Sequence, residues 1–502
     1  MPTKLSKQNN RLDMLLVNVP MTFSDLPPMA PALLKSCLIR EGYTAGTLDF
    51  NIRMVNQSAD LQHLIDYFLL SHADSETIKE AEQLAEKWAD EIIEINPRWV
   101  GISLFTFQCR SATNILCRLL KQKRPDIKIV IGGSGLSSGG INGINEYPRE
   151  LQSKGHIDHF IMSEAEESLI RLLKEDLDYP GIDSDTYNNV KDIESIPYPD
   201  WDDYDFSEYT PVMMIYGSRG CVRKCSFCDI HQHWKYTARP GESVAKEMIH
   251  QSEKYGVTDF RFADSLTNGS LKEFRKFIRI MAEYNDSAEK KITWTGYYIV
   301  RDPMAEKEEH WDLMKRSGAE RLLVGIESGS EKIREDMDKK FKNSDIDYLL
   351  EQAHKQGIKL TFLMIVGYPT ETREDFEETI AMFHRYKKYA GNTIENVSVS
   401  DTLGILPGTP LVRDLENLNI ILDPKFEINW LCLDNPELDL RTRVMRVIEL
   451  RDLISDLGYS HVSDHKMITM QMLNENEKRF NERLKIIAKT KAPKKTFNIV
   501  QI

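Results

Sequence analysis

Three cysteines crowded into one short stretch are the residues with the clearest capacity for chemistry. Cys221, Cys225 and Cys228 form a Cys-x3-Cys-x2-Cys loop. Three thiolates satisfy three irons of a 4Fe-4S cubane and leave the fourth iron without a protein ligand, whereas ferredoxin-type clusters use four cysteines. The spacing therefore predicts a 4Fe-4S cluster with one iron open to a further ligand.

A structural zinc site is the alternative for this loop. His231 or His233 could supply a fourth ligand, since Cys3His is a known zinc-binding set. A zinc site normally pairs Cys-x2-Cys with a distant second half, whereas these cysteines lie in one tight loop. Seven cysteines in all, three of them crowded together, suit metal ligation in a reducing compartment better than disulfides. The cluster is favoured, and a zinc-stabilised binding protein without catalytic activity is the hypothesis of a different class.

The composition is that of an ordinary globular protein. Of the 502 residues, 41% are hydrophobic and 28% are charged. The formal net charge of -13 argues against a nucleic-acid or anionic-membrane partner, because such surfaces concentrate Lys and Arg. No apolar run approaches the length of a membrane span, and the start, MPTKLSKQNN, lacks the apolar core of a signal peptide. We therefore expect a cytoplasmic protein.

The rest of the chain must position the cysteine loop, and its pattern predicts four stretches. Residues 1–190 are expected to form an α/β domain, and residues 191–210, which are acidic and carry Pro without a clean period, a linker. Residues 211–410 are expected to form a partial (β/α)6 barrel, and residues 411–502 a mainly helical cap. The fold class is therefore α/β.

Strands and helices alternate in both of the larger stretches. In the first, strands at Leu12–Pro20, around Val100 and up to Gly133 accompany a helix from Ser111 to Lys123 and a helical insertion from Asn56 to Ile95. That order indicates a doubly wound, Rossmann-like parallel sheet with a ligand crevice at the carboxyl ends of its strands. The second contains six predicted strands: VMMIYG, DFRFAD, ITWTGYYI, RLLVGI, KLTFLMIV and NVSVSDTLGI. Chemistry in such a barrel again lies at the carboxyl ends.

The cysteine loop, with the aromatic Phe227 before its last cysteine, resembles the signature of the radical S-adenosylmethionine (SAM) superfamily. The resemblance extends along the whole predicted barrel. It implies that the open iron binds the amino and carboxylate groups of SAM, and that one-electron reduction cleaves SAM to a 5′-deoxyadenosyl radical. An external one-electron reductant such as flavodoxin or ferredoxin is then the implied protein partner.

Three later segments resemble the SAM-contacting segments of the same superfamily. FADSLTNGS resembles the segment that holds the methionyl amino group, which implies a contact from Asp264. VGIESGSEKI resembles the segment that reaches the ribose and carboxylate, which implies Glu327 and Ser328. FLMIVGYPTET resembles the segment beside adenine, where the implied residues are Ile365, Gly367 and Pro369. Local structure is the alternative explanation, because Gly-Tyr-Pro suits a turn and Glu327 could cap a helix.

Within that superfamily the chain is similar to the subgroup with a preceding cobalamin-binding domain, such as class B methyltransferases and magnesium-protoporphyrin cyclases. The stretches that carry this resemblance are LLVNVPMTFSDLPPMAPALLKSCLIREGY, WVGISLFTF, KIVIGGSGLSS and IDHFIMSEAEESLIRLL. The residues implied near a bound cobalamin are Ser103, Thr106, Gly132, Gly133, Glu164 and Glu166. The domain lacks the Asp-x-His-x-x-Gly string of many cobalamin proteins, so no lower axial histidine is assigned.

Two other roles for the first domain stay open. The glycine-rich IGGSGLSSGG suggests dinucleotide binding, but Ser138 stands where the Gly-x-Gly-x-x-Gly spacing requires its third Gly. The domain could also bind no cofactor and only support the barrel or shape the substrate site.

The resemblance implies methyl transfer to an unactivated carbon of a small-molecule or peptide substrate that the sequence does not identify. A radical oxidoreductase, cyclase or rearrangement enzyme would share this architecture without methylating. A methylthiotransferase would need a second set of cluster cysteines, which the sequence lacks. No residue beyond the cluster cysteines is assigned a catalytic role. Because every implied SAM contact lies before Pro410, we expect a chain truncated there to keep SAM cleavage and lose substrate turnover.

Overall fold

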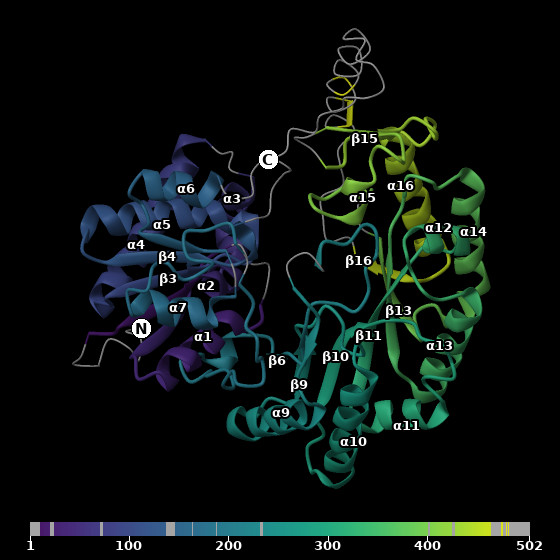
Figure 1. Cartoon of the computed structure of the whole chain (residues 1–502), viewed down its shortest axis with the longest axis horizontal. Coiled ribbons are helices and arrows are strands. Elements are labelled where there is room, and N and C mark those ends of the chain that lie inside the picture. The colour runs from purple at the N-terminus through teal and green to yellow at the C-terminus, as the bar shows by residue number, and fades with distance from the viewer. Residues whose placement is uncertain are drawn as a thin grey trace. The chain divides into compact units, whose positions relative to one another are not determined.

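The computed structural model describes residues 11–462, apart from 21–24, 71–73, 137–145, 163, 187, 231–233, 400–401 and 424–426, together with 473–474, 478 and 480. The chain divides into two compact units (Figure 1). The first contains most of the chain up to Ile215 and includes His250–Asp259, and the second contains Tyr216–Ile249 and the chain from Phe260. None of the described helices has the length and apolar character needed to cross a bilayer.

A five-stranded parallel sheet forms the centre of the first unit, in the order β2-β1-β3-β4-β5. Its strands are β1 (Met14–Asn18), β2 (Ala45–Asp49), β3 (Trp99–Ser103), β4 (Lys128–Gly132) and β5 (His159–Ile161). The strand order reverses between β1 and β3, and doubly wound sheets bind ligands at such a switch point. The doubly wound prediction is confirmed. The sequence did not reveal β2, because AGTLD is short and includes Gly and Asp, which are depleted in strands.

Helices cover both faces of this sheet, and the side chains of β1 alternate between two cores. Leu15 packs in an apolar cluster with Trp88, whereas its neighbour Leu16 packs in another with Leu38. The helices are α1 (Met29–Arg40), α2 (Phe50–Asn56), α3 (Ser58–Leu70), α4 (Ser75–Ile95), α5 (Arg110–Lys123), α6 (Glu146–Ser153) and α7 (Ala165–Leu173). The predicted helical insertion is present as α3 and α4.

Residues 191–210 contain one short 3-10 turn and pack as part of the first unit. Lys35 Nζ, which is buried, lies 2.8 Å from a carboxylate oxygen of Asp203. The Tyr209 hydroxyl donates to the buried Asp49 carboxylate at 3.1 Å. The stretch predicted as a linker is therefore fixed to the first unit by buried polar contacts.

A seven-stranded sheet, most of whose strands lie in the second unit, has the order β16-β13-β12-β11-β10-β9-β6. The strands are β6 (Val212–Ile215), β9 (Asp259–Phe262), β10 (Thr293–Tyr298), β11 (Ala319–Glu327), β12 (Lys359–Met364), β13 (Ile394–Val399) and β16 (Ser460–Val462). The helices between them are α9 (Gly241–Tyr255), α10 (Leu271–Ser287), α11 (Glu308–Arg316), α12 (Glu331–Asp336), α13 (Asn343–Gln356) and α14 (Arg373–Arg385). The six predicted barrel strands are confirmed in order, and β16 adds a seventh.

Up to Val462, the described part of the C-terminal region has more helix than strand, as predicted, but it also contains short strands that we did not predict. It contains the helices α15 (Pro410–Arg413) and α16 (Leu440–Asp456), but also the antiparallel strands β14 (Ile420–Leu422) and β15 (Trp430–Cys432), as well as β16. Strands of three residues are too short to show a period of two in a sequence. The long helix α16 therefore dominated the prediction.

Candidate functional site

The three cysteines follow the first strand of the barrel sheet. After β6 the chain forms the short strand β7 (Ser218–Arg219), which pairs antiparallel with β8 (Thr237–Ala238), so that the loop between them closes on itself. Gly220, at φ +74, permits this closure, because a Cβ there would lie 2.9 Å from the Trp234 carbonyl oxygen. The cysteine loop is thereby held at the carboxyl end of β6, where βα barrels place their chemistry.

The three thiols differ in exposure. Cys225 is buried, whereas Cys221 and Cys228 are half-buried. Burial raises the pKa of the Cys225 thiol and raises that of Cys228 to about 11, and a bound cation would favour the thiolates instead. Among the described residues, no three His, Cys, Asp or Glu side chains already converge on a metal position. His231 and His233, the alternative zinc ligands, lie outside the described residues.

The cysteine loop is anchored to other segments of the barrel through Ser226 and Phe227. Ser226 N donates to the Met337 carbonyl oxygen at 3.1 Å, and the Ser226 hydroxyl is hydrogen-bonded to the Tyr368 hydroxyl at 2.9 Å. Phe227 and Ile365 pack against the same apolar cluster. The structure thus brings the cysteines together with the segment expected beside adenine.

Glu327, at the end of β11, faces a lysine that the sequence did not single out. Lys339 Nζ lies 2.6 Å from a Glu327 carboxylate oxygen and 5.8 Å from the centre of the Phe227 ring. Burial opposes the charge of Lys339, but the negative charge around it, chiefly that of Glu327, outweighs burial and raises the pKa of Lys339. Lys339 therefore stays cationic. It stands in the run DMDKKF, where nothing distinguishes it from Lys340.

Two further implied SAM contacts, Asp264 and Ser328, also have protein partners. Asp264 accepts hydrogen bonds from Gly217 N at 2.8 Å and from the Ser218 hydroxyl at 2.6 Å, and complete burial raises its pKa to about 7. The Ser328 hydroxyl accepts from Ser330 N at 3.2 Å. Asp264 thus fixes the chain that enters the cysteine loop, and Ser328 shapes the turn before α12. A contact from either residue to SAM stays a prediction.

The residues implied on the adenine side lie together in the loop between β12 and α14: Ile365, Gly367 and Pro369. This loop also contacts the C-terminal region. Arg446 Nη1 on α16 donates to the Glu371 carboxylate at 2.8 Å, and Asn435 Nδ2 donates to the Pro369 carbonyl oxygen at 3.2 Å. A chain truncated after Pro410 would lose these contacts, and its expected SAM cleavage stays a prediction.

The residues implied near a cobalamin gather at the carboxyl edge of the first sheet. Ser103 and Gly132 end the adjacent strands β3 and β4, and Thr106 lies in the loop after β3. Phe105 and Phe107 of the same loop are 64% and 47% exposed. They add an apolar rim to this edge that our sequence analysis did not single out.

The two implied glutamates lie at the start of α7, after β5. The Glu164 carboxylate accepts a hydrogen bond from Val190 N at 2.5 Å, and Glu166 is buried in the first turn of the helix. Glu164 therefore fixes the segment that leaves the first sheet, and the structure gives it a role that needs no cofactor.

Gly133 is a point at which the loops after β3 and β4 approach each other closely. Its φ is +113, and a Cβ there would lie 2.3 Å from the Leu104 carbonyl oxygen. We expect Gly133→Ala to lower the free energy of unfolding by on the order of 3 kcal/mol. The strain of a positive φ and the steric clash of the new Cβ with the Leu104 carbonyl oxygen both contribute to this loss. Gly155→Ala is the matched control, since φ there is +69 with no atom within 4 Å, and it should cost about 1 kcal/mol. Equal losses in urea unfolding would contradict this packing argument.

Comparison with known proteins gives one family and several distant relatives. Residues 215–383 match the sequence profile of the Radical SAM superfamily. Cytidylyl-2-hydroxyethylphosphonate methyltransferase from Streptomyces wedmorensis is 26% identical over 233 residues, which cover 42% of each chain. The anaerobic magnesium-protoporphyrin IX monomethyl ester cyclase of Synechocystis sp. is 25% identical over 244 residues, covering 44% of this chain and 46% of the cyclase. The chain thus spans less than half the length of these curated relatives.

Two solved structures share the fold over most of this chain. The radical SAM methyltransferase TsrM from Kitasatospora setae, solved with cobalamin and a 4Fe-4S cluster bound, has a TM-score of 0.57 at 19% identity, over 81% of this chain and 78% of TsrM. The cobalamin-dependent SAM radical enzyme OxsB, solved with aqua-cobalamin and SAM bound, has a TM-score of 0.57 at 16% identity, over 95% of this chain and 62% of OxsB. The predicted α/β fold class is confirmed.

Proposed function

Because residues 215–383 form a radical SAM domain, we propose that the protein is a cobalamin-dependent enzyme that cleaves SAM reductively and transfers a methyl group. The observation that carries the proposal is the position of the Cys-x3-Cys-x2-Cys loop at the carboxyl end of β6, packed against the segment around Tyr368 and near the Glu327–Lys339 pair. A zinc-stabilised binding protein would not require that position.

The donor set fits a 4Fe-4S cluster held by Cys221, Cys225 and Cys228, because three thiolates leave one iron for SAM. When bound, the cluster supplies the electron that cleaves a carbon–sulfur bond of SAM, and a corrinoid serves as the methyl carrier. The Lys339 ammonium offsets part of the negative charge that the thiolates and Glu327 concentrate here. Phe227, which packs on its apolar cluster, and the buried Cys225 lie in the same loop.

For the first unit, we propose that the carboxyl edge of β3 and β4 binds cobalamin. The exposed rings of Phe105 and Phe107 suit the apolar face of a corrin, and the hydroxyls of Ser103 and Thr106 can hydrogen-bond its amide side chains. The shared fold with TsrM and OxsB, both solved with cobalamin, supports this assignment. No axial histidine is proposed.

The methyl acceptor is proposed to be an unactivated carbon of a small molecule or peptide, and the electron donor an external flavodoxin or ferredoxin. Similarity to a curated methyltransferase supports methyl transfer. The cyclase relative, at almost the same identity and coverage, supports a second candidate, which is a radical reaction without methyl transfer.

The products formed by anaerobically reconstituted protein separate these candidates. With dithionite as reductant and hydroxocobalamin as the corrin, we expect about one corrin per chain and release of both 5′-deoxyadenosine and S-adenosylhomocysteine. Deoxyadenosine alone, from protein that binds no corrin, would support the second candidate. Zinc in place of iron and sulfide would exclude both.

A further inference from the structure

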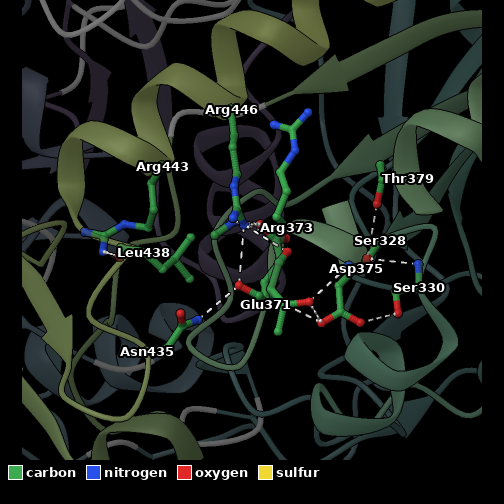
Figure 2. Close-up of polar contacts among 12 residues, drawn as sticks. Ser328, Ser330, Glu371, Arg373, Asp375, Thr379, Asn435, Leu438, Arg443 and Arg446 are labelled. Atoms are coloured by element: carbon green, nitrogen blue, oxygen red, sulfur yellow. Dashed lines mark hydrogen bonds and ion pairs between the residues drawn. The ribbon is translucent and has the colours of Figure 1, made fainter. Parts of the chain in front are cut away.

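The loop between β12 and α14 is held from the C-terminal region by a buried ion pair (Figure 2). Arg446 Nη1 donates to a Glu371 carboxylate oxygen at 2.8 Å and to the Thr372 carbonyl oxygen at 3.2 Å. The side chains of Arg446 and Glu371 are 8% and 2% exposed. Their relative position is strongly constrained, because either charge left alone in this place would be destabilising.

Glu371 transmits this constraint to the backbone of the loop. Gly367 N donates to both Glu371 carboxylate oxygens, each at 3.3 Å, and Glu371 N donates to the Tyr368 carbonyl oxygen at 2.8 Å. Gly367 has a φ of +84, and a Cβ there would lie 2.5 Å from Arg443 Cδ. The backbone at Gly367 therefore lies directly against α16, and any other residue would push it away.

Arg443 gives the loop a rigid surface to lie on. Its guanidinium is fully buried, lies 3.7 Å from the centre of the Trp430 ring and donates to the carbonyl oxygens of Leu438 (2.9 Å) and Ile428 (2.7 Å). Figure 2 shows the contact with Leu438. Arg443 Nε also donates to the Thr402 hydroxyl at 2.9 Å. Because its donors are bonded to the C-terminal region and to Thr402, the Arg443 side chain is fixed in place, and the loop packs against it.

The other side of the same loop reaches the cysteines and Glu327. The Tyr368 hydroxyl is hydrogen-bonded to the hydroxyl of Ser226, which stands between Cys225 and Phe227 in the sequence. Ile365 N donates to the Glu327 carbonyl oxygen at 2.9 Å. A displacement of the loop where it meets α16 would therefore also move the segments expected to surround SAM.

We propose that Glu371 and Arg446 are positioning residues for SAM, and that through them the C-terminal region sets the affinity of the barrel for SAM. The inference rests on the proposed function, because the resemblance to SAM-binding segments assigns residues 365–369 to the adenine side. The C-terminal region then acts on the shared co-substrate, in addition to any part it has in binding the methyl acceptor.

The test measures the dissociation constant for SAM by anaerobic equilibrium dialysis of the full-length, cluster-loaded protein. Iron and sulfide content and thermal stability are measured on the same samples. Arg446→Met should weaken SAM binding by roughly tenfold or more, because small displacements of positioning groups have effects of at least that order, with iron and sulfide unchanged. Arg446→Lys keeps the positive charge but loses the planar fork of donors, so it should weaken SAM binding less than Arg446→Met does. It replaces Arg446→Met in the test if that variant does not fold.

Glu449→Gln is the matched control. It breaks the exposed pair between Arg373 and Glu449, whose two contacts are 2.7 and 2.6 Å. This pair joins α16 to the first residue of α14, which follows the loop directly. Because this pair does not touch the loop, its loss should leave SAM affinity unchanged within about twofold.

The double variant Glu371→Gln/Arg446→Met separates positioning from stability. Removal of both charges should restore most of the thermal stability lost in Arg446→Met, because no buried carboxylate is left unpaired. SAM affinity should stay low, since the ion pair between α16 and the loop is still missing. Unchanged affinity in Arg446→Met, or recovery of affinity together with stability, would overturn the proposal. Wild-type protein that holds iron and sulfide but binds no SAM would instead overturn the proposed function, and this inference with it.

Discussion

Replacing Cys225 with Ala is expected to remove the 4Fe-4S cluster and, with it, all reductive cleavage of SAM. A cubane held by three cysteines has no spare protein ligand, so loss of one thiolate should release the iron. The fold should survive, because the change removes only one small side chain from the buried part of the second unit. Iron and acid-labile sulfide per chain, and 5′-deoxyadenosine formed with dithionite, are the measurements.

Cys432→Ala provides the control for the loss of a buried thiol. Cys432 is 4% exposed in the same unit, its thiol donates to the Leu418 carbonyl oxygen at 3.3 Å, and it is not one of the three cysteines of the loop. This variant should keep iron, sulfide and SAM cleavage, whereas Cys221→Ala and Cys228→Ala should behave like Cys225→Ala. Undiminished iron and sulfide in Cys225→Ala would refute the cluster assignment.

The second large effect is expected at Lys339. Lys339→Met should lower the free energy of unfolding by about 3–5 kcal/mol, because it leaves the Glu327 carboxylate buried without its cation. The Glu327 side chain is 9% exposed, so water cannot replace the ammonium group. Urea unfolding measures the loss, and SAM cleavage by the folded fraction is the second readout.

Lys340→Met is the matched control one residue further along. The Lys340 side chain is 59% exposed and pairs with Asp338 at the surface, so its replacement should leave stability nearly unchanged. The double variant Lys339→Met/Glu327→Gln removes both buried charges and should recover most of the lost stability. Two lysine variants of equal stability would show that the buried pair contributes nothing.

The strands that hold the site could be predicted because most of them are nearly continuous apolar runs. KLTFLMIV and RLLVGI have the composition of parallel strands covered on both faces, and the structure places them side by side as β12 and β11. Because the SAM-like motifs follow the cysteine loop one strand after another, the carboxyl ends of these strands were expected to lie on one edge of the sheet. The same argument brought Ser103 and Gly132 together in the first unit.

The sequence could not show which partner each polar side chain meets. FADSLTNGS pointed to Asp264, but its contacts with the chain before the cysteines depend on how two distant segments pack. Lys339 and Lys340 are identical in type, and only the turn after α12 directs one of them to Glu327. Arg443 and Arg446 stand on a helix with many charged residues, yet both are buried against a loop far away in the sequence. Tertiary packing decides each of these positions.

In the described part of the chain, β16 lies at one edge of the barrel sheet and pairs with β13. Because β13 ends at Val399 and β16 begins at Ser460, a growing chain completes β13 well before the ribosome has made its neighbour. During that interval β13 presents an open row of backbone donors and acceptors, which is a template for pairing with another chain. We therefore expect soluble yield to depend on how soon the C-terminal segment reaches this edge, and a form that stops before Ser460 to leave the edge open to aggregation.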